Sequence, residues 1–381
     1  MWTWTRLTIT VATADSQPAS AKGAELVGTN SIASLDPCPA RNCSYSAIGG
    51  VAGVLAYSGM AVAPNYGQQG GLVIHGGGHG DYWGNEVYVF DIAAARWTRI
   101  NRPSNAAAPD TDPRVDLEHG EYPDGSPMAA HTYDVMRVIP GGTKGLLLRA
   151  VAPSVAGSGG RGSGWSHACD LETGQWSRYS TNAAPSDRFK VADATCYDSV
   201  RNRIWELYRG GFHSQFAYLD LATREHVPVR IKSSNFGYNP CAAQAPVRDL
   251  MLFITGVYGV AAGPTLCAVD LMNPEAGMAT LKLTGDEIPA QPSPPWGFDW
   301  DTTQDCGYVF GGDNDANHLY RIDPPASRIL DEPWKVTKIT LPSPMPSNHA
   351  DGVYGHWRYV PTIKAFAYVS TVTNQVALYR P

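Results

Sequence analysis

Short apolar runs recur along the whole chain, and each ends in a glycine-rich or polar turn. Residues 70–100 show the pattern most clearly, with strand-like runs at 72–75, 86–90 and 96–100. β-branched and aromatic residues suit a pleated, half-buried surface, and glycines punctuate strands. No long segment shows helical apolar periodicity, so the pattern predicts an all-β chain.

The same grouping of strands returns along the sequence. Groups are predicted at 60–100, 131–179, 192–231, 241–283, 297–339 and 352–379. The first five hold four strands each, but the last holds only three before the chain stops at Pro381. Residues 1–11 contain Trp4-Thr5-Arg6-Leu7, which copies Trp97-Thr98-Arg99-Ile100, and we expect them to be the missing strand. Pairing the two ends of the chain closes a ring and removes an exposed edge.

The residues found at the ends of the strands also recur in a fixed order. Gly76-Gly77 ends a second strand, Tyr88 lies on the third and Trp97 opens the fourth; Gly311-Gly312, Tyr320 and Trp334 repeat this order. This order resembles the kelch repeat, a propeller blade of ~50 residues. The resemblance implies a six-bladed, kelch-like (galactose-oxidase-like) β-propeller whose last blade is closed by the N-terminal strand.

One domain over residues 1–381 follows from this count, with a closing strand at 1–11, a long loop or arm at 12–45 and blades at 46–381. A second long loop covers residues 101–126. A rival count of seven blades stays open if residues 24–44 hold another blade.

Charge and hydropathy argue against some classes of binding partner. The formal net charge is −6 and charged residues are 17% of the chain, which argues against electrostatic binding to nucleic acid or an anionic membrane. DNA would at most pass through the ring. No run approaches the ~20 apolar residues of a membrane span. Residues 1–13 alternate in character instead of forming the apolar core of a secretory signal.

The seven cysteines do not indicate a disulfide framework. Five lie in strand-like runs and are expected to be buried thiols: Cys169, Cys196, Cys241, Cys267 and Cys306. Cys38 and Cys43 lie close together in a loop, and whether they pair stays open.

Histidines recur near the ends of the second strands, at His79, His167, His213 and His318. Either they form a ring of imidazoles for a metal or polar ligand, or each bonds a neighbouring turn and standardises blade packing. We favour packing. His75, His79 and Asp81 are spaced like metal ligands, but His75 belongs to a strand, so we assign no metal and no cofactor.

Aromatic residues beside these turns suggest a binding surface. Exposed aromatics at a glycine-rich turn are typical of sugar stacking or of anchors into a partner. The candidate ligand-binding or partner-binding residues are therefore His79, Asp81, Tyr82, Trp83, Trp165, His167, Phe212, His213 and His318.

Other chemistries find less support. Residues 313–317 open like a calcium loop, but His318 and Pro324 stand where glycine and glutamate are required. Copper radical oxidases with kelch-type blades need a cross-linked tyrosine–cysteine pair that we cannot place. Six-bladed kelch enzymes acting on sialic acid are a closer match, and would use ionisable residues at the mouth: Arg188, Asp193, Asp299 and His349 are candidates. Catalytic residues are otherwise unknown.

A non-enzymatic structural or interaction propeller is the function that we favour. By fold-level analogy it resembles the nozzle or hub of a short-tailed bacteriophage tail, which would place it in a virion, self-associating and contacting other assembly proteins. Outside that setting we expect a cytoplasmic protein. The alternative is a glycan-binding or carbohydrate-active propeller, epimerase-like or oxidase-like. A kelch adaptor for a protein partner is less favoured.

Overall fold

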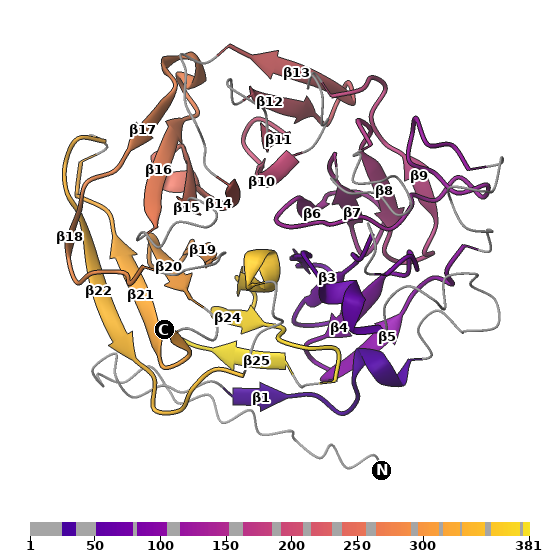
Figure 1. Ribbon diagram of the computed structural model, residues 1–381, viewed down its shortest axis with the longest axis horizontal. Coiled ribbons are helices and arrows are strands. Elements are labelled where there is room, and N and C mark those ends of the chain that lie inside the picture. Colours follow the sequence, from indigo (N-terminus) through magenta and orange to yellow (C-terminus); the bar gives the residue numbers. More distant parts are fainter. Residues whose placement is uncertain are drawn as a thin grey trace.

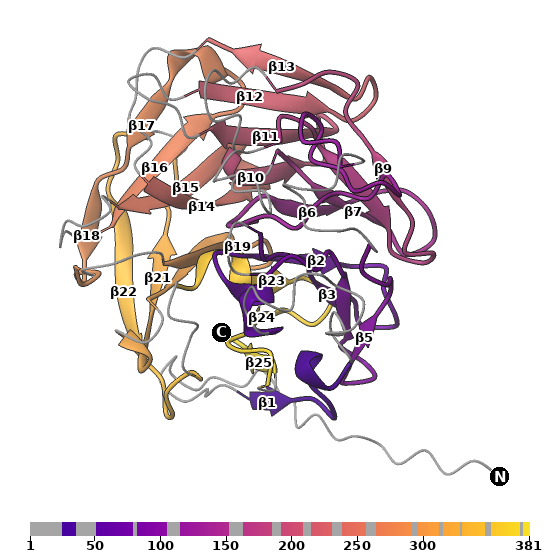
Figure 2. The same cartoon turned by 45° about the vertical axis from the view of Figure 1, so that its right-hand side comes forward.

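Six antiparallel sheets surround a central axis in the computed structural model (Figure 1). The structure describes residues 25–35, 51–78, 82–104, 115–151, 163–184, 192–208, 215–230, 238–256, 264–290, 296–311, 315–327, 330–346, 352–373 and 376–381. The turned view in Figure 2 shows the blades as stacked strands around the ring. The predicted all-β, six-bladed propeller is therefore confirmed.

Each blade runs outward from its first strand. Blade 1 is β2 (Met60–Ala63), β3 (Gly71–Ile74), β4 (Tyr88–Asp91) and β5 (Arg96–Arg99); blade 2 is β6 (Met136–Ile139), β7 (Leu146–Arg149), β8 (His167–Asp170) and β9 (Trp176–Arg178); blade 3 is β10 (Ala192–Asp198), β11 (Arg203–Tyr208), β12 (Gln215–Asp220) and β13 (Glu225–Val229). Blade 4 is β14 (Tyr238–Ala245), β15 (Leu250–Gly256), β16 (Thr265–Asp270) and β17 (Met278–Thr280); blade 5 is β19 (Gly297–Asp301), β20 (Cys306–Phe310), β21 (His318–Asp323) and β22 (Trp334–Thr340); blade 6 contains β23 (Trp357–Val360), β24 (Ala365–Tyr368) and β25 (Val376–Tyr379).

Both faces of these sheets are buried. Val73 and Val89 of blade 1 pack with Leu147 of blade 2, whereas Leu148, the next residue, packs with Ile204 of blade 3. Successive side chains of a strand point to opposite faces, so neighbouring blades share apolar layers. This explains why the strands read as continuous apolar runs.

An N-terminal strand closes blade 6, as expected, but it is not residues 1–11. The strand is β1 (Glu25–Val27), which pairs antiparallel with β25 through Leu26 opposite Ala377. Residues 1–11 lie outside the described residues. Figure 1 shows β1 beside β25 at the outer edge of blade 6.

Residues after β1 seal the seam between blades 6 and 1. Asn30 donates from Nδ2 to the Trp97 carbonyl at 3.0 Å and accepts from the Trp97 amide at 2.8 Å. Ile32, in the short 3₁₀ helix η2 (Ile32–Ser34), is buried in the same cluster as Trp97, and Ala33 bonds the Val372 carbonyl at 3.1 Å. Part of the predicted loop at 12–45 is thus a structural clamp.

Blade 4 differs from its expected form. The group predicted to end at residue 283 does not end in one strand, because β17 pairs within blade 4 while β18 (Leu283–Gly285) pairs in parallel with β22 of blade 5. This segment therefore covers the outer edge of the next blade.

A buried carboxylate joins the blades at the axis. Asp134, just before β6, accepts from Arg137 at 2.9 Å, from Arg358 of blade 6, and from the Ala242 amide of blade 4 at 2.6 Å. Arg358 also donates to the Met60 carbonyl of blade 1 at 2.9 Å. The first strands are therefore tied by charge-assisted hydrogen bonds as well as by apolar packing.

The ring has two distinct faces because successive strands alternate in direction. We call the side with the second-to-third strand connections and the blade-to-blade connections the loop face. The opposite side, with the first-to-second and third-to-fourth connections, is the turn face. The 3₁₀ helix η7 (Tyr354–His356) precedes β23 and lies near the centre of the ring (yellow coil, Figure 1).

Candidate functional site on the loop face

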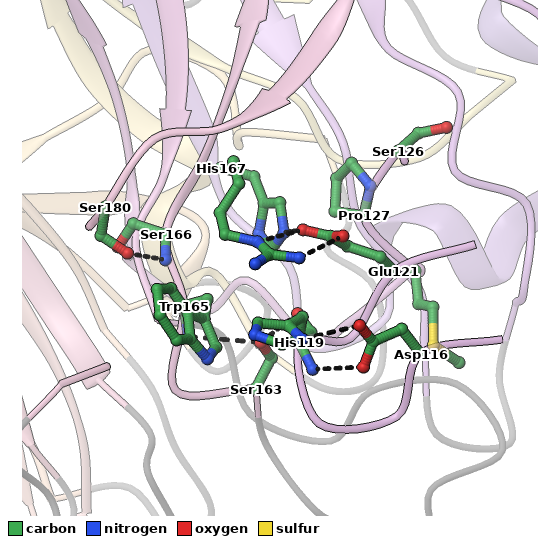
Figure 3. A network of polar contacts seen from close by, with 12 residues as sticks. Asp116, His119, Glu121, Ser126, Pro127, Ser163, Trp165, Ser166, His167 and Ser180 are labelled. Atoms are coloured by element: carbon green, nitrogen blue, oxygen red, sulfur yellow. Dashed lines mark hydrogen bonds and ion pairs between the residues drawn. The ribbon is translucent and has the colours of Figure 1, made fainter. Parts of the chain in front are cut away.

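The candidate site lies where the connection between blades 1 and 2 folds over blade 2. Asp116 and Glu121 exchange backbone hydrogen bonds at 2.9 Å, which makes a small hairpin of this acidic segment. The hairpin places His119 and Glu121 beside Trp165 and His167, at the start of β8 (Figure 3). Sequence alone predicted Trp165 and His167 here but not their acidic cover.

Glu121 is the hub of this network. Arg178 donates to both of its carboxylate oxygens at 2.7 Å, and His167 donates from Nε2 at 2.9 Å. Burial opposes the charge, but the hydrogen bonds from Arg178 and His167 outweigh it and lower the pKa of Glu121 to about 2. Glu121 therefore stays ionised at neutral pH.

His167 is held as a neutral imidazole. Burial, helped by the charge of Arg149 and opposed by the bond to Glu121, lowers the pKa of His167 to about 4. Because Nε2–H donates to Glu121, Nδ1 accepts from Arg149 Nη2 at 3.4 Å. The two bonds fix one tautomer of the ring.

Trp165 is half-buried between two polar side chains. The His119 ring lies 4.8 Å from its ring, and the Arg178 guanidinium lies 5.1 Å from the ring centroid. His119 is itself oriented by Asp116, whose carboxylate lies 2.6 Å from Nδ1. The open parts of the site are the side chains of Asp116, 43% exposed, and Arg178, 34% exposed.

Two of the predicted aromatic residues are not exposed. Tyr82 is 5% exposed and Trp83 is 7% exposed, so the expectation of an exposed platform at these positions was wrong. Tyr82 donates to Glu86 at 2.8 Å, and Trp83 accepts at its carbonyl from Tyr122 at 2.7 Å. Tyr82 belongs to the apolar cluster of blades 6 and 1, and Trp83 to the cluster between blades 1, 2 and 3.

The histidines do not form one ring of ligands in the described part of the loop face. His167 bonds Glu121 in blade 2, whereas His318 in blade 5 bonds Asp315 at 2.5 Å. Glu121 comes from the connection between blades 1 and 2, 46 positions from His167, whereas Asp315 lies three positions before His318. Both partners are side-chain carboxylates and not the turns that we expected. His79, Asp81, Phe212 and His213 lie outside the described residues.

A second buried network joins blades 2 and 3, and sequence analysis missed it. His226 lies 2.9 Å from Glu206 through Nδ1 and 3.2 Å from the Ser166 hydroxyl through Nε2. All three residues are buried. The Ser166 amide bonds Ser180 at 3.0 Å, and its carbonyl accepts from Tyr179 at 2.8 Å, so this set fastens the two blades together.

Three tyrosines at the centre of the loop face were also missed. Tyr57, Tyr133 and Tyr354 precede first strands and have φ of 48°, 30° and 45°. The Tyr133 and Tyr354 rings are 5.1 Å apart, and Tyr57 lies 6.2 Å from Tyr133. Left-handed backbone at a bulky residue is costly and persists only where packing imposes it. The signal was the repeated position of tyrosine three residues before the strand.

The expected acid–base candidates are partly described. Asp193 is buried, while Arg188 and His349 lie outside the described residues. Asp299 accepts from the Tyr359 amide at 2.8 Å and from the Trp300 amide at 2.9 Å. Burial raises the pKa of Asp299 to about 6, against the effect of these bonds. Its bond to the Tyr359 amide joins blade 5 to blade 6, and the residue is only partly buried.

The described residues contain no candidate metal cluster, and their cysteines are not paired. Among those residues no group of three or more His, Cys, Asp or Glu side chains is arranged to hold a metal ion. The five described cysteines are buried free thiols, as predicted. Cys38 and Cys43 lie outside the described residues. No helix in the described part of the chain is long and apolar enough to cross a membrane.

Comparison with known proteins finds solved structures of low similarity. No protein-family model and no curated protein matches the sequence. Similar solved structures include hydrazine synthase from Kuenenia stuttgartiensis, with 12% identity, a TM-score of 0.46, and coverage of 85% of this chain and 83% of that chain. They also include a copper-bound fungal alcohol oxidase of the AA5 family, with 10% identity and a TM-score of 0.46. That match covers 85% of this chain and 62% of the oxidase.

Proposed function

We propose that this chain is an interaction propeller that acts by binding and assembly and not by catalysis. The observation that carries this proposal is the geometry of the loop-face network, in which Arg178 at 2.7 Å and His167 at 2.9 Å bond Glu121 and hold the acidic hairpin on blade 2. Glu121, with its pKa near 2, and His167, with its pKa near 4, keep one protonation state on both sides of neutral pH. A general acid–base catalyst works best with a pKa near the working pH. These two groups instead hold the acidic hairpin on blade 2.

The finer identity that we propose is a component of a larger assembly. We assign the blades to the kelch type on Gly76-Gly77, Tyr88 and Trp97, and by fold-level analogy we place the protein in the tail of a short-tailed bacteriophage. The six-bladed closed ring supports this reading. The net charge of −6 is also compatible, because a protein with a net negative charge does not attract the phosphates of DNA.

Sedimentation of the full chain tests the assembly role. At micromolar concentration we expect a species heavier than the 41.0 kDa of one chain, with a mass that falls on dilution or stays constant if the assembly is tight. A single 41.0 kDa species over the whole micromolar range would contradict the proposal.

Carbohydrate recognition at Trp165 is the second candidate. The partly exposed ring lies between Arg178 and the Asp116–His119 pair. An aromatic ring flanked by planar polar groups can contact the C–H face of a sugar while the polar groups bond its hydroxyls. The carbohydrate-active form of this candidate would need an acid–base pair beyond Glu121 and His167.

A glycan array separates the two candidates. If a sugar is bound, Trp165→Ala is expected to weaken binding about tenfold, because an aromatic contact at a binding site is worth at least ~1.4 kcal/mol. Tyr197→Ala, a partly buried aromatic at the turn-face end of β10 in blade 3, is the matched control and should leave affinity unchanged. If the protein binds no glycan on the array, or if the Trp165 variant binds as well as the wild type, this candidate is excluded.

A further inference from the structure

The side chains around Trp165 carry more negative than positive charge. Three carboxylates of the acidic hairpin act electrostatically on Arg178: those of Asp116, Glu118 and Glu121. Three carboxylates therefore surround one guanidinium, which leaves an excess of two negative charges at the site. The sign of the charge at a binding surface decides which charged ligands it attracts and which it repels.

Arg178 is already paired within the chain. Its Nε and Nη2 atoms both donate to the Glu121 carboxylate at 2.7 Å. Its Nη1 atom bonds none of the described residues, and the side chain is 34% exposed. Arg178 can therefore donate a hydrogen bond to a ligand, but its positive charge is already balanced by Glu121.

Two acidic side chains of the hairpin are open to solvent. Asp116 is 43% exposed, and its carboxylate orients His119 through the 2.6 Å contact with Nδ1. Glu118 is exposed, and its carboxylate bonds no other residue in the described part of the chain. An ionised carboxylate accepts hydrogen bonds but cannot donate them. These two side chains are therefore suited to hydroxyl and ammonium groups, which donate.

The other basic groups of the network are not available to balance an anion. Arg149 is fully buried and donates to the Met128 carbonyl and, at 3.4 Å, to His167. His167 is buried and neutral, because burial lowers its pKa to about 4. A proton on His119 would be balanced by Asp116, which lies beside it. Among the described residues, the open part of this site thus has no unbalanced cation.

We propose that the Trp165 site binds sugars that carry only hydroxyl or amino groups and rejects sugars that carry a carboxylate or a sulfate. This rests on the carbohydrate recognition proposed above and names its ligand class. A hydroxyl donates to Asp116 or Glu118 and accepts from Arg178 Nη1, and an ammonium group gains from both carboxylates. An acidic group would lie beside two open carboxylates, and contacts between like charges across a binding surface are strongly unfavourable.

Matched pairs of glycans test this selection in the full-length chain. Each neutral glycan on an array is printed beside the same glycan with a terminal sialic acid, a uronic acid or a sulfate. At low ionic strength we expect each acidic member to bind at least about fivefold more weakly than its neutral partner. The difference should shrink as salt is added, because salt screens charges near the surface.

A single charge-removing variant tests the role of the open carboxylates. Glu118→Gln removes one negative charge but can still accept a hydrogen bond. It should narrow the gap between acidic and neutral glycans at least about twofold and leave the affinity for neutral glycans unchanged. Glu172→Gln is the matched control, because Glu172 is also exposed but lies in the turn between β8 and β9, on the turn face. A thermal melt of each variant checks that the fold is retained.

The results separate this inference from the carbohydrate function. If acidic glycans bind as tightly as their neutral partners, or if Glu118→Gln leaves the gap unchanged, selection by charge is overturned and glycan binding still stands. If Trp165→Ala leaves neutral glycan binding intact, the sugar binds elsewhere and the proposed site is overturned. A chain that binds no glycan on the array would exclude the carbohydrate function itself, and this inference with it.

Discussion

Acidification from pH 6.5 to 4.5 is expected to lower the free energy of unfolding by about 3 kcal/mol through three titratable groups. Burial lowers the pKa of His75 to about 3 and that of His167 to about 4. Below pH 6.5 the unfolded chain binds protons at both positions but the folded chain does not. Each histidine therefore costs about 1.4 kcal/mol of stability per pH unit in this range.

Asp299 acts in the opposite direction. Its pKa is raised to about 6 in the folded state, so between pH 6 and about 4 the folded chain holds a proton that the unfolded chain does not. This raises the free energy of unfolding by about 1.4 kcal/mol per pH unit of acidification and offsets the effect of one histidine. The net effect is a loss of stability on acidification.

Two variants separate these contributions. His167→Gln keeps a donor for Glu121 but does not titrate, so the loss between pH 6.5 and 4.5 should shrink to about 0.5 kcal/mol. Asp299→Asn removes the opposing group, and the loss should grow to about 5 kcal/mol. Chemical denaturation of each protein at the two pH values measures this, with each variant compared with itself at pH 6.5. Equal losses in all three proteins would show that these groups do not control the pH dependence.

Local patterns in the sequence were sufficient for the blades. The groups predicted to begin at residues 192 and 297 begin with β10 and β19, because apolar runs bounded by turns reveal buried strands. The glycine doublet and tryptophan repeat gave the number of blades. Strand pairing within a blade joins neighbours in sequence, so local signals are enough to find it.

Ring closure depends on a long-range strand pairing, and local sequence patterns do not show which N-terminal segment forms it. Residues 1–11 copy the Trp97 motif, whereas Glu25–Val27 is only three residues long and lies among turn-forming residues. What favours the short strand is the clamp that follows it, in which Asn30 bonds Trp97 and Ile32 enters the core. These contacts join residues more than sixty positions apart.

The loop-face site was foreseen only in part, for the same reason. Trp165 and His167 were identified from an aromatic and a histidine beside a turn. Glu121 reaches them through a hairpin of the previous connection, 46 residues away from His167. Tyr82 was expected at the surface, but a glycine-rich turn does not reveal whether it folds outward or inward. Pairing of side chains between connections decides these positions.

The seam between the first and last blades is tested most directly by two truncations that differ only in residues 25–35. We expect the chain that begins at residue 36 to be less stable than the chain that begins at residue 25 by at least about 4 kcal/mol, because it loses the β1–β25 pairing and the buried Ile32. Ile32→Ala in the full chain should cost about 2 to 4 kcal/mol, and keeps the test decisive if the shorter chain does not fold. Equal stability of the two truncated chains, or a loss of this size on removing residues 1–11 alone, would contradict a ring closed by Glu25–Val27.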